Sequence, residues 1–210
     1  MISLRRKLLN SLIKKNSSFI KGKILDIGGK KSIQTLIFKK NINYHSLNND
    51  KNTNPTFLRE ASSIPSKRNY YDTVLMFEVL EYLDDYDLVL KEIKRVLKKN
   101  SYFLFSSPFL FPVHYDYKND FQRFTKAKIM KICKDYNFKV IKILEMGSIG
   151  TCLYDIIRIS LTYTSANKNY FLKFFFRILL PVFEYIDLLN INKKKFINSG
   201  YFVVVKKRID

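Results

Sequence analysis

The residues best suited to chemistry begin with Asp26-Ile27-Gly28-Gly29, which directly follow a short apolar run. Glycine has no Cβ and accepts positive φ, so the backbone amides of such a turn can come close to a bound ligand. The run lacks the fuller G-x-G-x-x-G pattern of dinucleotide sites. Taken alone, it fits a simple turn between a strand and a helix as well as it fits a ligand-binding loop.

Strands and helices alternate along the part of the chain that would position this turn. Short apolar runs predict strands, and apolar residues recurring every three or four positions predict helices. The predicted strands are 23–27, 43–47, 57–61, 71–77, 101–106, 139–144 and 200–206, and the predicted helices are 3–20, 32–38, 84–97 and 125–136. This order predicts an α/β fold with a doubly wound, mostly parallel seven-stranded sheet and helices on both faces. Ligands of such sheets bind outside the carboxyl ends of the strands.

Details of three elements follow from the same patterns. In the helix over 84–97 the spacing predicts that Leu88 faces inward with Ile93. Thr125 stands where an N-cap residue is expected. The strand over 200–206 is expected to be an antiparallel addition at or near an edge of the sheet.

Length and composition predict one domain over 1–210. The chain has 210 residues, of which 47% are hydrophobic, enough for one core. Residues 1–20 are expected to form an amphipathic helix, and 151–198 a helical insertion or cap before the last strand. Cys133 and Cys152 form no C-x-x-C pair, and the first residues contain no long apolar segment. A disulfide framework is therefore excluded and a cytoplasmic setting is expected.

The formal net charge of +20 would ordinarily indicate nucleic acid or an anionic membrane as partner. The basic residues are spread along the whole chain, however, and an AT-rich genome would give the same abundance of Lys, Asn and Ile. The apolar stretch 170–190 contains too many charges to cross a membrane. It fits a helix that caps the core or forms a homodimer contact, and, over 168–190, a helix on an anionic membrane surface. Nucleic acid is not favoured, because no recognition motif accompanies the aromatic residues.

Three segments together resemble the class I S-adenosylmethionine-dependent methyltransferases, in the group of the type 11 methyltransferases. They are KILDIGG, YYDTVLMFEVLEYLDD and LKEIKRVLKKNSYFLFSSPF, in this order and spacing, and the resemblance spans about three fifths of the chain, 23–148. A fourth segment, FPVHYDYKNDFQRFT, is similar to one found in a branch associated with bacterial cell-surface polysaccharide genes. The resemblance implies S-adenosylmethionine as cofactor and a small-molecule or saccharide acceptor, in the cytoplasm or at the inner face of the membrane.

The resemblance also implies which residues bind the cofactor. Asp26, Gly28 and Gly29 would line its methionine end, Asn48 would face the ribose, Glu60 and Ala61 the adenine, and Phe77 and Glu78 the cleft after the fourth strand. The chain departs from the family pattern at Asn48, where a carboxylate is usual, at Lys30 and Lys31, where glycines are common, and at Tyr82, where His is usual. An amide cannot offer the two charged acceptor oxygens of a carboxylate.

On the acceptor side, His114 is the candidate base. A hydroxyl acceptor needs a base, whereas an amine must only be unprotonated, and the ordinary pKa of His suits proton transfer near neutral pH. The alternative is that His114 only forms hydrogen bonds within its loop. Arg123 either binds an anionic substrate or pairs with Asp120. Tyr115 and Tyr117 could stack on a sugar or form a lid.

Two other functions stay open at the level of sequence. The departures at Asn48, Lys30 and Lys31 are compatible with a non-catalytic, methyltransferase-like scaffold at a membrane or in a glycan-assembly complex. An RNA methyltransferase is favoured only by the net charge.

Overall fold

The computed structural model describes residues 3–29, 43–114, 117–164, 170–189 and 197–208. The helix predicted over 32–38 lies outside these residues, as do Lys30, Lys31 and Tyr115.

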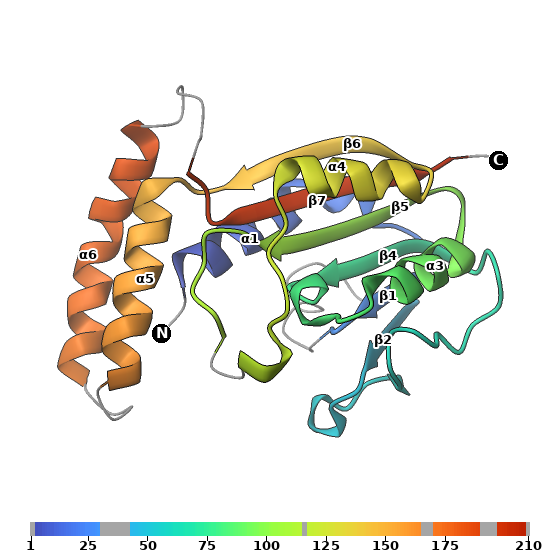
Figure 1. Ribbon diagram of the computed structural model, residues 1–210, viewed down its shortest axis with the longest axis horizontal. Helices are drawn as coiled ribbons and strands as arrows, with labels where there is room; N and C mark the ends of the chain where they lie inside the picture. The colour runs from blue at the N-terminus through green and yellow to red at the C-terminus, as the bar shows by residue number, and fades with distance from the viewer. Residues whose placement is uncertain (1–2, 30–42, 115–116, 165–169, 190–196, 209–210) are drawn as a thin grey trace.

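Seven strands form one sheet through the middle of the molecule (Figure 1). They are β1 (Ile24–Ile27), β2 (Tyr44–Asn48), β3 (Phe57–Leu58), β4 (Tyr71–Phe77), β5 (Leu97–Pro108), β6 (Phe138–Met146) and β7 (Gly200–Lys207). Across the sheet the order is β3-β2-β1-β4-β5-β7-β6. The first five strands of this order are parallel to one another, and β7 is antiparallel to both β5 and β6. The predicted fold class is confirmed. The last strand is antiparallel and lies one position from the edge, because β6 lies outside it.

Helices cover both faces of this sheet. α1 (Leu4–Lys15) packs on one face, and α3 (Tyr86–Val96) and α4 (Lys126–Asp135) pack on the other (Figure 1). Successive side chains of a strand point to opposite faces, and β4 supplies both cores in this way. Val74 and Met76 belong to the core under α3 and α4. Leu75 and Phe77 belong to the core under α1. Strands buried on both faces explain the continuous apolar run in the sequence.

Capping residues set where two helices begin. The side chain of Thr125 accepts a hydrogen bond from the backbone N–H three positions on, so the predicted N-cap is confirmed. Asp85 caps α3 in the same way, and α3 therefore begins later than the predicted helix over 84–97. The prediction that Leu88 faces inward is wrong. Its side chain is 49% exposed, and the adjacent Val89 is buried instead.

Two C-terminal helices, α5 (Ile149–Thr164) and α6 (Tyr170–Leu189), form an antiparallel pair that projects beyond one end of the sheet (Figure 1). They occupy most of the range 151–198 in which the sequence predicts a helical insertion. Among the described residues, no helix combines the length and the apolar character that crossing a bilayer requires.

Two carboxylates connect this pair to its surroundings. Asp187 of α6 accepts hydrogen bonds from the backbone N–H groups of Ser148 and Thr151, both at 3.1 Å, and so caps the start of α5. Asp155 of α5 is fully buried and accepts from the backbone N–H groups of Leu4 at 3.1 Å and Arg5 at 3.0 Å. These are the first two amides of α1, which have no partner within a helix. The helix pair therefore fixes the start of α1.

Candidate active site

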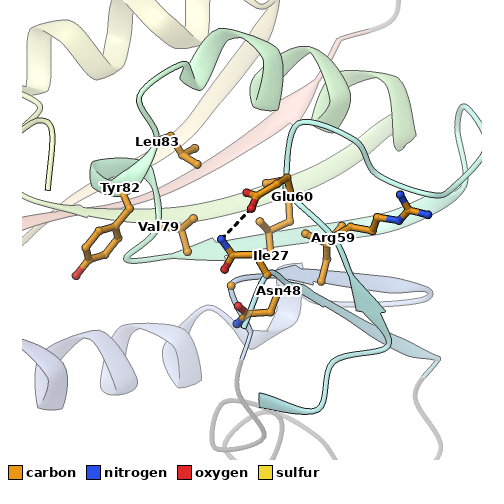
Figure 2. A pocket seen from close by; sticks show the side chains of 11 residues that line it. Ile27, Asn48, Arg59, Glu60, Val79, Tyr82 and Leu83 are labelled. Atoms are coloured by element: carbon orange, nitrogen blue, oxygen red, sulfur yellow. Dashed lines mark hydrogen bonds between the residues drawn. The ribbon is translucent and has the colours of Figure 1, made fainter. Parts of the chain in front are cut away.

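A pocket of about 230 Å³ lies at the carboxyl ends of β1 and β2 and beside the loop that follows β4 (Figure 2). This is the location at which parallel α/β sheets bind their ligands. The pocket is lined by Ile27, Gly28, Leu47, Asn48, Asn49, Arg59, Glu60, Ala61, Val79, Tyr82 and Leu83. Four predicted cofactor residues are thus brought together around one cavity: Gly28, Asn48, Glu60 and Ala61.

The glycine turn after β1 forms one wall of the pocket, and its two glycines are required by their surroundings. Gly28 has φ +72°, and a Cβ there would lie 2.3 Å from Cγ2 of Val79. A Cβ on Gly29 would lie 2.4 Å from Oδ2 of Asp26. A larger residue at Gly28 would strain the turn and clash with Val79, and one at Gly29 would displace the Asp26 carboxyl group.

Asp26 lies beneath this turn and is not among the residues that line the pocket. Its Oδ2 accepts a hydrogen bond from the Tyr44 hydroxyl at 2.6 Å, and its Oδ1 has no hydrogen-bond partner among the described residues. Burial raises the pKa of Asp26 to about 7, and the hydrogen bond from Tyr44 offsets only part of this rise. The direct contact predicted between Asp26 and the cofactor therefore stays a prediction; in the structure Oδ2 of Asp26 lies close to Gly29.

Polar groups line the opposite wall of the pocket. Oδ1 of Asn48 accepts from the backbone N–H of Asp50 at 3.0 Å, so its Nδ2 is left to donate. Nδ2 of Asn49 donates to Oε1 of Glu60 at 3.1 Å, the contact drawn in Figure 2. The Glu60 carboxylate has further acceptor capacity beside the buried Ala61. This wall offers one amide donor and one carboxylate acceptor to a ligand.

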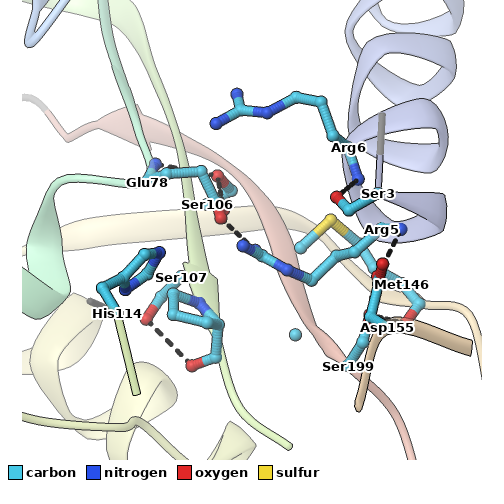
Figure 3. A network of polar contacts seen from close by, with 12 residues as sticks. Ser3, Arg5, Arg6, Glu78, Ser106, Ser107, His114, Met146, Asp155 and Ser199 are labelled. Atoms are coloured by element: carbon cyan, nitrogen blue, oxygen red, sulfur yellow. Dashed lines mark hydrogen bonds and ion pairs between the residues drawn. The ribbon is translucent and has the colours of Figure 1, made fainter. Parts of the chain in front are cut away.

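Glu78 directly follows β4, and its side chain points toward α1 and does not line the pocket (Figure 3). It is a non-glycine residue with φ +58°, a conformation that costs about 1–2 kcal/mol. Two contacts hold it there: the Ser106 hydroxyl donates to its Oε1 at 2.6 Å, and the Arg5 guanidinium forms an ion pair with its Oε2. Phe77, the other residue predicted at this point, stacks on Phe202 in the core under α1.

Arg5 does not line the pocket, but from the first turn of α1 it holds Glu78 beside the pocket. It is only 4% exposed, and its guanidinium lies 4.1 Å from the centre of the Phe111 ring. Its backbone N–H is held by Asp155, as described above. A buried charge needs a partner of opposite sign, and Glu78 is that partner.

Glu81 is the second buried carboxyl group of this region. It is fully buried in the short helix after β4, η3 (Leu80–Tyr82), and neither of its carboxyl oxygens has a hydrogen-bond partner among the described residues. Burial, and then repulsion from Glu78, raises the pKa of Glu81 to about 8, while the charges of Arg5 and Arg123 oppose the shift. At neutral pH this carboxyl group is largely protonated.

His114 forms a dyad with Asp120. Its Nδ1 lies 3.1 Å from Oδ2 of Asp120, which also accepts from the backbone N–H of His114 at 2.8 Å. Arg123 donates to both oxygens of Asp120. Of the two roles that the sequence allowed for Arg123, the structure therefore shows the pair with Asp120. Burial would raise the pKa of Asp120, but the hydrogen bonds from Arg123 and His114 outweigh it and hold this pKa well below its usual range.

An ionised Asp120 leaves Nδ1 of His114 as the donor, and Nε2 is then the free acceptor. Burial lowers the pKa of His114, and the hydrogen bond that His114 donates to Asp120 only partly opposes this shift. The imidazole is therefore neutral near pH 7. Its ring packs on the ring of Tyr82, 5.0 Å away between centres, and Tyr82 in turn lines the pocket. His114 thus lies behind one aromatic side chain of the pocket wall.

Among the charged residues in and around the pocket, Arg5, Arg59 and Glu81 were not predicted. Arg59 precedes the predicted Glu60, and proximity alone could have identified it. Glu81 is an acidic residue between apolar neighbours at the end of a buried strand, which is a usable signal. Arg5 gives no signal, because it is one of several basic residues of an amphipathic helix.

The comparison with protein families agrees with this geometry. The family model of the methyltransferase domain matches residues 25–105, which include the glycine turn, the pocket and Glu78. Residues 25–105 are thus similar to a methyltransferase domain, and the α/β fold of the chain is that of the class I methyltransferases. A search of curated proteins finds no match.

Solved structures with the same fold are similar to nearly the whole chain. The cyclase SpnF has 12% identity over 96% of this chain and 80% of its own, with a TM-score of 0.64. A SAM-dependent methyltransferase from Archaeoglobus fulgidus has 17% identity over 96% and 94%, with a TM-score of 0.61. Phosphoethanolamine N-methyltransferase 2 of Haemonchus contortus, in complex with S-adenosyl-L-methionine, has 16% identity over 96% and 52%, also with a TM-score of 0.61. At these identities the likeness shows the fold, and activity has to be argued from the site.

S-adenosylmethionine is the ligand of the Haemonchus contortus structure and the cofactor that the sequence resemblance implies for this chain. The described residues fit it. Gly28 has no side chain, so its backbone is open to the pocket. A Cβ at this position would narrow the pocket beside Val79. Nδ2 of Asn48 can donate to a ribose oxygen, and the Glu60 carboxylate can accept from the exocyclic amine of adenine.

The first prediction concerns the buried ion pair. Arg5→Met should lower the free energy of unfolding by about 3–5 kcal/mol, because it leaves Glu78 buried without its counter-charge. Urea denaturation at pH 7 measures this. Arg6→Met is the matched control, since Arg6 is the exposed neighbour on the same helix turn, and its effect should be within about 0.5 kcal/mol. The double variant with Glu78→Gln should recover part of the loss. Equal effects of the two arginine variants would contradict the assignment.

The second prediction concerns Glu81. Its pKa is raised from 4.5 to about 8 by folding, so its contribution to stability is complete below pH 4.5 and is lost as the pH rises through 8. The Glu81→Gln variant carries no such proton. The difference in melting temperature between this variant and the wild type should therefore increase from pH 5 to pH 9. The increase should correspond to a few kcal/mol in the free energy of unfolding. Asp84→Asn, at an exposed carboxyl group three positions away, should show no such trend. A Glu81→Gln difference independent of pH would disprove the shift.

Proposed function

We propose that this chain transfers the methyl group of S-adenosylmethionine to a hydroxyl group of a saccharide or similar small-molecule acceptor. The observation that carries the proposal is the His114–Asp120 dyad behind Tyr82 at the pocket. A hydroxyl is a poor nucleophile until it loses its proton, whereas an amine acceptor would need no such dyad. The aromatic rings of Tyr82 and Phe111, which both pack on His114, suit stacking on a sugar ring.

The residues of the chain divide the work. When bound, the cofactor supplies a methyl group already activated on a sulfonium. Asp120, fixed by Arg123, orients the His114 imidazole so that Nε2 takes the proton from the acceptor hydroxyl as its oxygen bonds to the methyl carbon. Tyr82 and Leu83 close the pocket wall and limit the access of water. Most of the rate enhancement would come from alignment of the reacting atoms.

The acceptor class has a second line of support in the sequence. The segment around His114 is similar to one associated with bacterial cell-surface polysaccharide genes, so we include a role in surface polysaccharide biosynthesis in the proposal. The same segment supplies Asp120 and Arg123, the two residues that orient the imidazole.

The third prediction tests cofactor binding by titration calorimetry. The wild type should bind S-adenosylmethionine, and Gly28→Ala should abolish measurable binding, because the added Cβ meets Val79 and shifts the turn. Gly22→Ala is the matched control. Gly22 also has positive φ, +66°, and its Cβ would meet Asp72 away from the pocket, so this variant should lose stability but keep binding. Absence of binding by the wild type at millimolar cofactor would refute the proposal.

The fourth prediction tests the base. In an assay of methyl transfer from labelled cofactor to a panel of nucleotide sugars, His114→Gln should lower turnover by about 10²–10⁴. The affinity for the cofactor should stay unchanged, since His114 does not line the pocket. Asp120→Asn should lower turnover and change the pH profile, because it no longer fixes the imidazole. An active His114→Gln enzyme would point to an amine acceptor and remove the role of the base.

A further inference from the structure

The outward surface of α6 is almost entirely apolar. Seven large side chains are between 44% and 63% exposed: Phe174, Phe175, Ile178, Val182, Tyr185, Leu188 and Leu189. Their spacing of three and four residues places them along one side of the helix. On the other side Phe176 is fully buried and packs on Tyr154 of α5.

The adjacent helix α5 has the same character. Ile149, Leu153, Ile156 and Ile157 are 37% to 42% exposed and also recur at helical spacing. The apolar faces of α5 and α6 together, defined by these eleven residues, are called the hairpin surface below. Proteins that stay monomeric in solution rarely expose so many neighbouring apolar side chains, and such surfaces usually contact a partner or a membrane.

The charges of the helix pair show which partner fits. Its three acidic residues within the described part of the chain, Asp155, Glu184 and Asp187, are all engaged. Asp155 and Asp187 cap helix termini, and Glu184 pairs with Lys7. The exposed Arg177, in contrast, lies on α6 among the apolar residues. The hairpin surface thus combines apolar and aromatic side chains with a basic one and exposes no unpaired carboxylate.

We propose that the hairpin surface binds an anionic lipid bilayer, with α5 and α6 lying in the plane of the interface. Helices of this kind bury their apolar side at the boundary of headgroups and acyl chains, and basic residues attract anionic lipids. A second copy of the chain is the less suitable occupant, because two molecules with a net charge of +20 repel one another. The inference goes beyond the proposed function and does not rest on it.

Vesicle flotation with the full-length protein tests the inference. The wild type should float with vesicles of phosphatidylglycerol and phosphatidylcholine, and much less with phosphatidylcholine alone. The pair Ile178→Asp and Val182→Asp should lower the bound fraction at least about tenfold, because both positions are more than half exposed on α6. The matched control is Leu88→Asp with Met130→Asp, at positions 49% and 54% exposed on α3 and α4, and it should float like the wild type.

Three results would overturn the inference. The wild type could fail to float, the two double variants could float equally well, or binding could be the same on neutral vesicles. Light scattering on the same samples identifies the alternative occupant: a wild-type dimer that Ile178→Asp with Val182→Asp makes monomeric, without vesicle binding, would assign the hairpin surface to a second copy. Calorimetry with S-adenosylmethionine on these samples keeps the outcome separate from that of the proposed function.

Discussion

The ion pair between Arg5 and Glu78 is the interaction on which the active-site region depends. Glu78 sits in a strained backbone conformation at the end of the central strand β4, in a place from which water is largely excluded. A carboxylate there would be strongly destabilising without a cation, and the guanidinium from α1 supplies it. The next residue, Val79, packs against Gly28 and lines the pocket. The first turn of α1 therefore stabilises the wall of a pocket that it does not touch.

The same region concentrates more acidic than basic groups, and the pKa shifts follow from this imbalance. Arg5 and Arg123 face Glu78, Glu81 and Asp120, so one carboxyl group is left without compensation. Glu81 has no hydrogen bonds to its oxygens and therefore retains its proton. Asp120 receives the direct hydrogen bonds and stays ionised, which suits its role beside His114.

The fold was predictable because its signals are local. Runs such as 71–77 are apolar on both faces, and glycine, Asp85 and Thr125 mark the turns and helix starts. The cofactor side of the site was also predictable, since Gly28, Asn48, Glu60 and Ala61 lie at or shortly after the ends of recognisable strands. Their roles toward the cofactor stay predictions.

What the sequence did not reveal are contacts between distant segments. No local pattern distinguishes Arg5 from the other basic residues of α1, because its burial depends on Phe111, Glu78 and Asp155 arriving from three other elements. Leu88 was misassigned for a related reason. Its spacing fits the apolar stripe, but the way in which α3 lies on the sheet decides which edge of that stripe is covered.

The position of β7 has a consequence for how the molecule is made. This strand is hydrogen-bonded to both β5 and β6, yet it is the last of the seven to leave the ribosome. Until residue 207 has emerged, the nascent sheet ends at an open β5 edge while β6 lacks its neighbour. Such an edge can pair with other chains, and the run Phe202-Val203-Val204-Val205 is itself rich in strand-forming residues. The core is therefore complete only once β7 has inserted between β5 and β6, and a partly synthesised chain exposes an edge that favours aggregation.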